Sequence, residues 1–200
     1  MLENKLGITT QSELDKAEER VSKSSAKRMY ESGDINSLEV GTYEGLVGIH
    51  TYLFEDIYAF AGETRTVNIA KGNFMFAPVM YLEGSLKGIN QMPQANLDEI
   101  VAKYVEMNIA HPFRDGNGRS TRIWLDLILK KELKSVVDWR AIKKEEYFSA
   151  MERSPVNDLE IRNLIRGALT DKIHSREVFM AGIDVSYFYE GFAHYRIGEL

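Results

Sequence analysis

The sequence predicts a mostly α-helical fold with a single β-hairpin. Apolar residues recur at the three- and four-residue spacing of helices in most segments, and β-branched residues are scattered rather than gathered in alternating runs. The stretch GETRTVNIAKGNFMFAP, residues 62–78, is the exception, because it contains two short β-prone runs around AKGN. We therefore expect a helical bundle with one hairpin.

Two helices are expected before the hairpin. The first covers about residues 12–31, where Ser12 and Asp15 offer a capping pair and SGDINS breaks the pattern. The second covers about residues 39–59. Its apolar side chains repeat at helical spacing and are Leu46, Ile49, Leu53, Ile57 and Phe60. This stripe predicts a helix that packs against the core.

Further helices are expected after the hairpin. Their approximate ranges are residues 81–90, 96–110, 119–133, 139–153, 158–172 and 175–190. The segment RSTRIWLDLILKKEL, residues 119–133, is strongly apolar on one side, which predicts a central position in the bundle. With 200 residues and no internal repeat, the chain suits one compact domain with a single core.

Composition excludes several classes of function. The net charge is −5 and no run of Lys or Arg exceeds a pair, so a nucleic acid is not an expected partner. The absence of cysteine excludes disulfides, thiolate metal sites and a cysteine nucleophile. No segment has the length of a membrane-spanning helix or the apolar run of a signal peptide, so we expect a cytoplasmic protein without a membrane partner. Three histidines have no second ligand at helical spacing and are expected to be structural or exposed: His50, His174 and His194.

The segment HPFRDGNGRSTR, from His111 to Arg122, concentrates the reactive side chains. It lies between two predicted helices, and the glycines on both sides of Asn117 allow positive φ angles that aim backbone N–H groups at one point. The next helix is expected to begin near Gly118, so the positive end of its dipole faces the same point. This arrangement predicts an anion-binding site.

Four side chains extend this site. Arg119 and Arg122 lie three residues apart on the next helix, and both can reach the oxygens of a polyphosphate. Asp115 offers the hard oxygen ligand that suits a Mg²⁺ bridging phosphates. His111 can accept a proton from a hydroxyl. Each feature alone has an ordinary explanation, such as a helix-end histidine, a turn or a solvated face, whereas one phosphate site explains all of them together.

The same segment resembles the signature of the Fic family. The pattern His-x-Phe-x-Asp/Glu-Gly-Asn-Gly-x-x-x-Arg matches at every specified position, and the resemblance extends over about residues 39–166. It implies a Fic-type helical bundle that transfers AMP from ATP to a Ser, Thr or Tyr hydroxyl of a protein and releases pyrophosphate. The implied partners are ATP and a protein target, which could be the chain itself.

The resemblance also implies a role for each motif residue. His111 would be the general base on the target hydroxyl, Phe113 would anchor the loop in the core, and Asp115 would hold Mg²⁺ or another divalent metal. The hole for the α- and β-phosphates would be formed by Gly116, Asn117 and Gly118. Arg119 would contact the β-phosphate region, and Arg122 the γ-phosphate.

In Fic proteins the hairpin, called the flap, pairs with the backbone of the target. The corresponding target-binding segment here is Lys71, Gly72, Asn73, Phe74, Met75 and Phe76. An exposed strand edge suits such main-chain pairing. A hairpin that only closes the core with Phe74 and Phe76 is compatible with the same sequence. Glu63 and Arg65 are expected to pair within the hairpin.

The stretch DVSYFYEGF near the end of the sequence has a second notable spacing. Ser186 and Glu190 lie four residues apart on one helical face, and Gly191 suits a C-cap. From the residues alone, this is a terminal amphipathic helix. The pattern S-x-x-x-E-G resembles the autoinhibitory motif of class III Fic proteins, which implies an inhibitory helix over about residues 175–191. Glu190 would then pair with Arg122 and displace the γ-phosphate.

Alternative chemistries remain open. The resemblance also implies that Glu190 could orient a water that removes AMP from a modified protein. A kinase or another phosphate-group transferase on a Fic scaffold is an alternative, although kinase-like relatives differ at the positions of Gly116, Gly118 and Arg119, which are intact here. A non-enzymatic nucleotide-binding regulator is a third, and the intact His111 argues against it.

Overall fold

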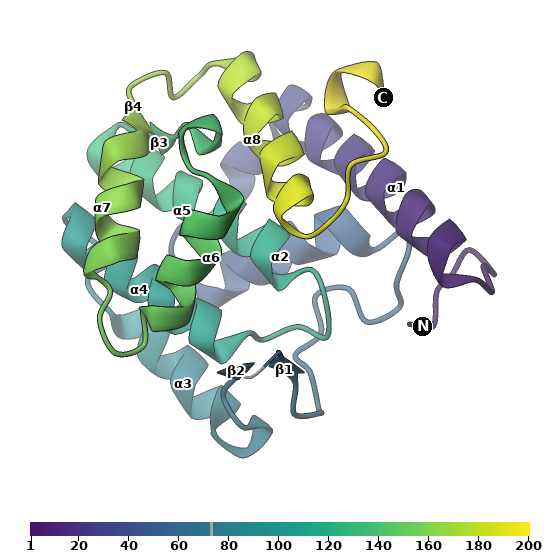
Figure 1. The fold of residues 1–200 in the computed structure, drawn as a ribbon, viewed down its shortest axis with the longest axis horizontal. Coiled ribbons are helices and arrows are strands. Elements are labelled where there is room, and N and C mark those ends of the chain that lie inside the picture. Colours follow the sequence, from purple (N-terminus) through teal and green to yellow (C-terminus); the bar gives the residue numbers. More distant parts are fainter. Residues whose placement is uncertain (73) are drawn as a thin grey trace.

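The computed structural model describes residues 1–72 and 74–200. Asn73, which belongs to the predicted target-binding segment, lies outside the described residues. Figure 1 shows a bundle of helices with a short hairpin toward its lower edge, which confirms the predicted mostly α-helical fold. Within the described ranges, no helix combines the length and the apolar composition needed to cross a membrane.

Eight α-helices lie in the described ranges. They are α1 (Gln11–Glu31), α2 (Tyr43–Phe54), α3 (Val79–Gln91), α4 (Leu97–Ala110), α5 (Asn117–Leu133), α6 (Lys144–Arg153), α7 (Leu159–Ala168) and α8 (Arg176–Tyr189). Two antiparallel pairs of short strands are β1 (Ala70–Lys71) with β2 (Phe74–Met75) and β3 (Val136–Val137) with β4 (Leu169–Thr170). The 3₁₀ helices are η1 (Asp34–Ser37), η2 (Trp139–Ala141) and η3 (Ile197–Glu199).

The capping pair of α1 differs from the prediction. The helix begins at Gln11, and its capping residues are Thr10 and Glu13 rather than Ser12 and Asp15. The Glu13 N–H donates to Thr10 Oγ1 at 3.4 Å, and the Thr10 hydroxyl donates to the Glu13 carboxylate at 2.6 Å. The predicted pair was wrong because a capping residue must precede the first helical residue, whereas Ser12 is already inside the helix.

Helix α2 is shorter than predicted at both ends. Thr42 caps its start, because Thr42 Oγ1 accepts a hydrogen bond from Gly45 N–H at 3.1 Å. After the helix, the N–H groups of Ile57 and Tyr58 both donate to Phe54 O at 2.9 Å. The apolar pattern continues past the helix end because these turn residues are also buried.

The segment after α5 also differs from the prediction. The helix expected over residues 139–153 is divided into η2 and α6. The Asp126 carboxylate accepts hydrogen bonds from Val137 N–H at 2.8 Å and Trp139 Nε1 at 3.0 Å, which holds the chain in a turn before α6. The helix expected over residues 158–172 ends early because β4 pairs with β3.

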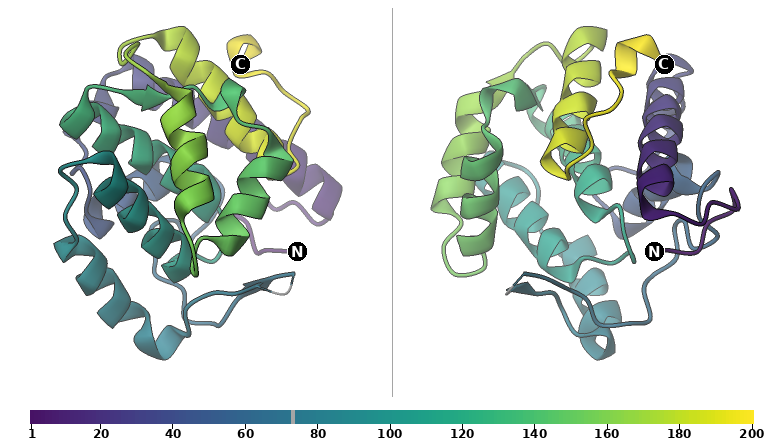
Figure 2. Two further views of the ribbon diagram at one scale, coloured as in Figure 1. Left: turned by 60° about the vertical axis from the view of Figure 1, so that its left-hand side comes forward. Right: turned by 45° about the vertical axis from the view of Figure 1, so that its right-hand side comes forward.

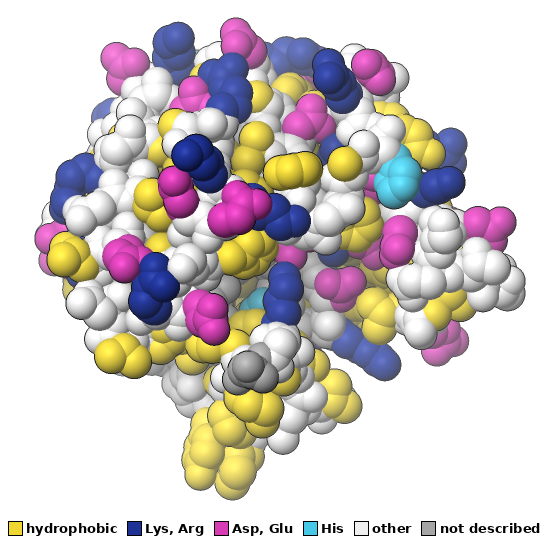
Figure 3. Space-filling model, viewed as in Figure 1, with side chains coloured by type: hydrophobic (Ala, Val, Ile, Leu, Met, Phe, Trp, Pro, Cys, Tyr) yellow, Lys and Arg dark blue, Asp and Glu magenta, His cyan; other side chains and the backbone are white. Residues whose placement is uncertain are grey.

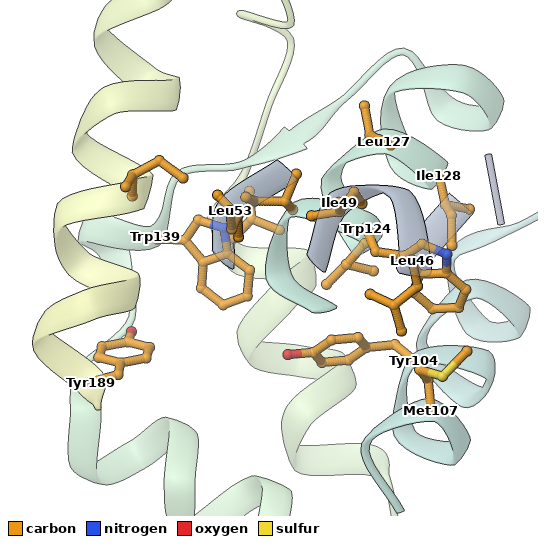
Figure 4. Packing of buried hydrophobic residues seen from close by; sticks show 14 of the residues in the cluster. Leu46, Ile49, Leu53, Tyr104, Met107, Trp124, Leu127, Ile128, Trp139 and Tyr189 are labelled. Carbon is orange, nitrogen blue, oxygen red and sulfur yellow. The ribbon is translucent and has the colours of Figure 1, made fainter. Parts of the chain in front are cut away.

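Helix α5 lies at the centre of the bundle, as predicted from its apolar side. It packs against α2, α4 and α8, while α1 packs against α2 and α8. Figure 4 shows Trp124 and Ile128 of α5 beside Leu46 of α2 and Tyr104 and Met107 of α4. Figure 2 shows from two further sides that the backbone of the hairpin lies at the edge of the bundle. The helices therefore form the base on which the hairpin lies.

Replacing Leu46 by alanine tests this core. Leu46 is fully buried between α2 and α5, so we expect Leu46→Ala to lower the free energy of unfolding by about 2–5 kcal/mol through lost burial and the cavity that remains. Urea unfolding followed by circular dichroism measures the change. Leu159→Ala is the matched control, because Leu159 is 53% exposed and its loss should cost less than about 0.5 kcal/mol. Equal losses in the two variants would contradict the assignment of the core.

Candidate active site

The loop between α4 and α5 carries the motif, and its backbone turns sharply at both ends. His111 ends α4 in the left-handed conformation with φ 47°, and Gly116 precedes α5 with φ 76°. Non-glycine residues with positive φ are strained and concentrate at functional sites. A Cβ on Gly116 would also lie 2.5 Å from an atom of the Phe54 ring. Position 116 therefore requires glycine for its φ and for its close packing.

Side chains beneath the loop hold it in place. Phe113 is fully buried, as predicted, and its ring stacks on His50 with the centroids 3.9 Å apart. The Asn117 amide accepts a hydrogen bond from Phe113 N–H and donates one to Phe113 O, both at 2.8 Å. The Asn117 side chain thus braces the loop, and its backbone N–H, in the first turn of α5, is the group available to an anion.

The loop opens into a cavity of about 710 Å³. This volume is within the usual range of small-molecule sites. The cavity brings together the motif, the hairpin and the end of α8, and its lining includes Lys71, Gly72, Phe74, Phe76, His111, Asp115, Gly116, Asn117, Gly118, Arg119, Arg122 and Glu190. The residues that the sequence proposed as the general base, the anion hole and the inhibitory glutamate, Glu190, therefore share one cavity.

His111 has the protonation state that a general base needs. Its Nδ1 lies 3.3 Å from the Asn108 carbonyl, which can only accept, so Nδ1 carries the proton and Nε2 keeps its lone pair. The ring stacks on Phe76 of the hairpin at 3.6 Å between centroids. Burial lowers the pKa of His111 to about 4. The imidazole is consequently neutral at pH 7.

Arg122 is buried against α8. Its Nη2 donates to Glu190 Oε1 at 2.8 Å, and its Nε donates to Ser186 Oγ at 2.7 Å. The exposed fraction of the Arg122 side chain is 2%. The two residues singled out in the S-x-x-x-E-G pattern therefore contact the same guanidinium.

The Glu190 carboxylate holds a second cation from the hairpin. Lys71 Nζ lies 2.9 Å from Glu190 Oε2. Burial would raise the pKa of Glu190, but the charges of Arg122 and Lys71 outweigh it and lower this pKa to about 2. Glu190 is ionised throughout the neutral range, and both of its oxygens are engaged.

Two glycines allow Glu190 to reach this position. A Cβ on Gly118 would lie 2.4 Å from Glu190 Oε1, so the carboxylate lies directly over the first turn of α5. Gly191 has φ 95° and donates its N–H to Phe188 O at 3.1 Å, which ends α8 beside Glu190. An anion therefore already occupies the positive end of α5.

Asp115 and Arg119 lie on the opposite side of the same turn. The Asp115 side chain is 44% exposed, and its Oδ1 accepts a hydrogen bond from Gly116 N–H at 2.7 Å. Arg119 is buried, and its Nη2 lies 3.5 Å from Asp115 Oδ1. In the part of the chain that is described, no group of three or more His, Asp or Glu side chains could hold a metal. A metal at Asp115 would thus depend on ligands from a substrate.

The hairpin covers the cavity with one face. Ala70 pairs with Met75 and Lys71 with Phe74, so Lys71, Phe74 and the following Phe76 share the cavity face. Met75 points away and is 66% exposed. Figure 3 shows apolar side chains gathered at the lower edge of the molecule, where the hairpin meets the start of α3. Within 67–72 and 74–76, the hairpin residues lie where the sequence predicted.

Comparison with known proteins agrees with this geometry. The model of the Fic/DOC family matches residues 41–129. A probable protein adenylyltransferase of Sinorhizobium fredii, y4lH, is 30% identical over 182 residues, which cover 82% of this chain and 91% of the relative. The chain belongs to the Fic/DOC family. The protein adenylyltransferase VbhT of Bartonella schoenbuchensis is 31% identical over 189 residues, which cover 88% of this chain and 38% of VbhT.

Solved structures share the fold at lower identity. The N-terminal Fic domain of Bep8 from Bartonella sp. 1-1C has a TM-score of 0.72 and 18% identity, with 86% of this chain and 92% of that chain covered. The BepC protein of Bartonella tribocorum, solved with bound AMPPNP, has a TM-score of 0.68 and 19% identity, with 85% and 92% covered. These likenesses show a Fic fold for this chain.

His50, which the sequence predicted to be structural or exposed, is buried beneath the Fic motif. The Gly62 N–H donates to His50 Nδ1 at 2.9 Å, so Nε2 carries the proton and donates to Asp115 O, also at 2.9 Å. Burial lowers the pKa of His50 to about 4. His50 thus fixes the backbone of the metal-candidate residue, a role that its isolated place in the sequence could not indicate.

Arg65 also has a different role from the one predicted. It pairs with no carboxylate in the described residues, so the expected pair with Glu63 was wrong. Its guanidinium is buried and donates to His111 O at 2.7 Å, Ala110 O at 3.1 Å and Val67 O at 2.8 Å, as well as to Ala77 O. These bonds join the end of α4 to the base of the Fic hairpin.

The low pKa of His50 makes stability depend on pH. The unfolded histidine takes up a proton below about pH 6.5, whereas the folded one does so near pH 4, so its contribution to stability is lost as the pH falls from 6.5 to 4. Urea unfolding at pH 7 and 4.5 should show a loss about 1–3 kcal/mol smaller in His50→Gln than in the wild type. His111 remains in both proteins, so its own titration cancels. Identical losses would show that His50 is not the group responsible.

Proposed function

We propose that this chain is a protein adenylyltransferase that moves AMP from ATP to a Ser, Thr or Tyr hydroxyl of a protein. The observation that carries the proposal is the neutral His111, whose free Nε2 shares one cavity with the positive end of α5 and with Arg122. The names of the relatives support the same reaction. We also propose that the chain forms a single Fic domain, and a cytoplasmic location stays a prediction.

His111 supplies the base in this proposal. Its Nε2 takes the proton of the target hydroxyl while the hydroxyl oxygen attacks the α-phosphorus, and the bond to pyrophosphate breaks. The backbone N–H groups of Asn117 and Gly118 stabilise the charge on the phosphates, and that of Gly116 would join them once the Asp115 carboxylate releases it. Arg119 and Arg122 contact the β- and γ-phosphates, respectively. The loop backbone and Arg119 are held in place before the substrate arrives, whereas Arg122 becomes available only when Glu190 releases it.

Asp115 would hold a Mg²⁺ ion. Its carboxylate is half-exposed beside the anion-binding turn, which fits an ion that keeps most of its waters and is shared with substrate phosphates. When bound, such an ion neutralises charge on the phosphates and on the leaving pyrophosphate. His50 keeps Asp115 in place through the backbone carbonyl.

Glu190 is proposed to inhibit the transfer. It holds Arg122 and lies over the first turn of α5, where a γ-phosphate would otherwise bind. Ser186 supports the lock through its bond to Arg122 Nε, and Gly191 ends the helix so that the carboxylate can turn inward. ATP that binds beside Glu190 would have its α-phosphate misaligned for attack.

The hairpin is proposed to bind the target as a flap. Of the proposed segment 71–76, in which Asn73 is not described and Met75 points outward, the residues that border the cavity are Lys71, Gly72, Phe74 and Phe76. A target strand that pairs with this edge would bring its hydroxyl toward Nε2. The target could be another protein or a second copy of this chain.

Transfer of labelled phosphate tests the proposed reaction. With Mg²⁺ and ATP labelled on the α- or the γ-phosphate, only α-label should reach protein. Glu190→Gly should raise transfer by about tenfold or more, equivalent to about 1.4 kcal/mol, because Arg122 is freed for the γ-phosphate. His111→Ala in the Glu190→Gly background should lower it by about 10²–10⁴ because the base is lost. Transfer of γ-label would indicate a kinase, and nucleotide binding without transfer would indicate a regulator.

Removal of AMP tests a second proposed role of Glu190. Its ionised carboxylate can orient a water toward the phosphodiester of a modified protein, so the same cavity would support deAMPylation. AMP-modified protein should lose its AMP in the presence of the wild type. With Glu190→Gly or Glu190→Gln, the rate of AMP release should be at least about tenfold lower. Mass spectrometry of the modified protein measures the loss. Undiminished release by both variants would remove this role from Glu190.

A further inference from the structure

A buried carboxylate from the N-terminal helix contacts the first arginine of the motif. Glu18 of α1 is 3% exposed, and it accepts a hydrogen bond from Arg119 Nη1 across 101 residues of sequence. Its other oxygen accepts from the Tyr58 hydroxyl. Glu18 precedes residues 41–129, which match the family model, so the motif does not account for this contact.

Glu18 accepts the hydrogen bond that orients the Arg119 guanidinium. The guanidinium carbon lies 4.8–5.3 Å from the centroids of three aromatic rings, those of Phe54, Tyr187 and Phe192. Such rings attract a cation without fixing its orientation as a hydrogen bond does. In the chain as described, Arg119 Nε is buried without a hydrogen-bond partner. The orientation of the group therefore depends on Glu18.

Asp115 is the second carboxylate within reach of Arg119. The distance from Arg119 Nη2 to Asp115 Oδ1 is 3.5 Å, longer than a good hydrogen bond. Arg119 thus lies between a buried carboxylate to which it donates a hydrogen bond and a half-exposed one with which it forms only a long ion pair. Without the charge of Glu18, the buried cation would lack its partner, which is costly, and Asp115 is the neighbour that could replace it.

We propose that Glu18 is a positioning residue that limits Arg119 to a long ion pair with the Asp115 carboxylate and so leaves Asp115 available to a divalent cation. A guanidinium and a divalent cation compete for one carboxylate, because each neutralises its charge. Glu18 acts only through Arg119 and touches neither nucleotide nor target. The inference rests on the proposed adenylyltransferase function, which supplies the reason for a cation at Asp115.

Binding of ADP at different Mg²⁺ concentrations tests this role. Glu18→Gln keeps the size of the side chain and removes its charge. The full chain carrying Glu190→Gly is the parent, and calorimetry measures ADP affinity with EDTA and over a Mg²⁺ series. In Glu18→Gln, the affinity for ADP measured with EDTA should stay within about twofold of the parent. The Mg²⁺ concentration that gives half of the maximal increase in ADP affinity should rise about fivefold or more, equivalent to about 1 kcal/mol.

Glu19→Gln is the matched control. Glu19 is the next residue of α1 and equally buried, but its carboxylate binds Lys23 and the N–H groups of His194 and Tyr195 outside the cavity. Its Mg²⁺ requirement should equal that of the parent. The conservative variant Glu18→Asp keeps the negative charge on α1 beside Arg119 and should keep the Mg²⁺ requirement within about twofold of the parent.

The outcomes separate this inference from the proposed function. An unchanged Mg²⁺ requirement in Glu18→Gln, or an equal rise in Glu19→Gln or in Glu18→Asp, would overturn the role of Glu18. Equal weakening of ADP binding with and without Mg²⁺ would also overturn it, because that is the effect of a purely structural residue. A parent that binds ADP with Mg²⁺ but transfers no α-label would overturn the proposed function alone.

Discussion

Two guanidinium groups buried at the start of α5 govern the rest of the structure. A buried cation is costly unless a carboxylate meets it, and the motif itself offers only the half-exposed Asp115. Glu18 reaches Arg119 from α1, and Glu190 reaches Arg122 from the end of α8. Helix α8 packs against α5, and α1 packs against α2 and α8, which brings Glu18 within reach of Arg119.

The same charges suit the proposed substrate. A site that neutralises two guanidiniums with carboxylates is also one where phosphates bind when a carboxylate leaves. Glu190 is the partner placed to leave, because it is 18% exposed, lies at the end of a helix and shares its charge with the exposed Lys71. Glu18 lies inside α1 rather than at its end, is buried, and accepts a hydrogen bond from the Tyr58 hydroxyl. The two pairs thus differ in exposure to solvent although their chemistry is alike.

The fold follows the sequence where one local pattern dominates. Apolar spacing located the long helices and the hairpin, since burial of one face repeats along each element. Apolar spacing did not indicate β3 and β4, because strands of two residues are too short to show a repeat. It also predicted a continuous helix across η2, where hydrogen bonds to the Asp126 carboxylate turn the chain. It also misplaced the cap of α1, because Ser12 and Thr10 are both cap-forming residues and only the backbone distinguishes them.

For the active site, the sequence by itself determined the twelve residues from His111 to Arg122 and their local geometry. Glycines, a helix start and three-residue spacing act over one turn of chain, so they operate without distant partners. Only the tertiary structure decided that Arg65, His50 and Glu18 support this turn. Their contacts join residues that are 46 to 101 positions apart in the sequence and depend on how the helices pack. No local sequence pattern indicates which distant residue a buried side chain will contact.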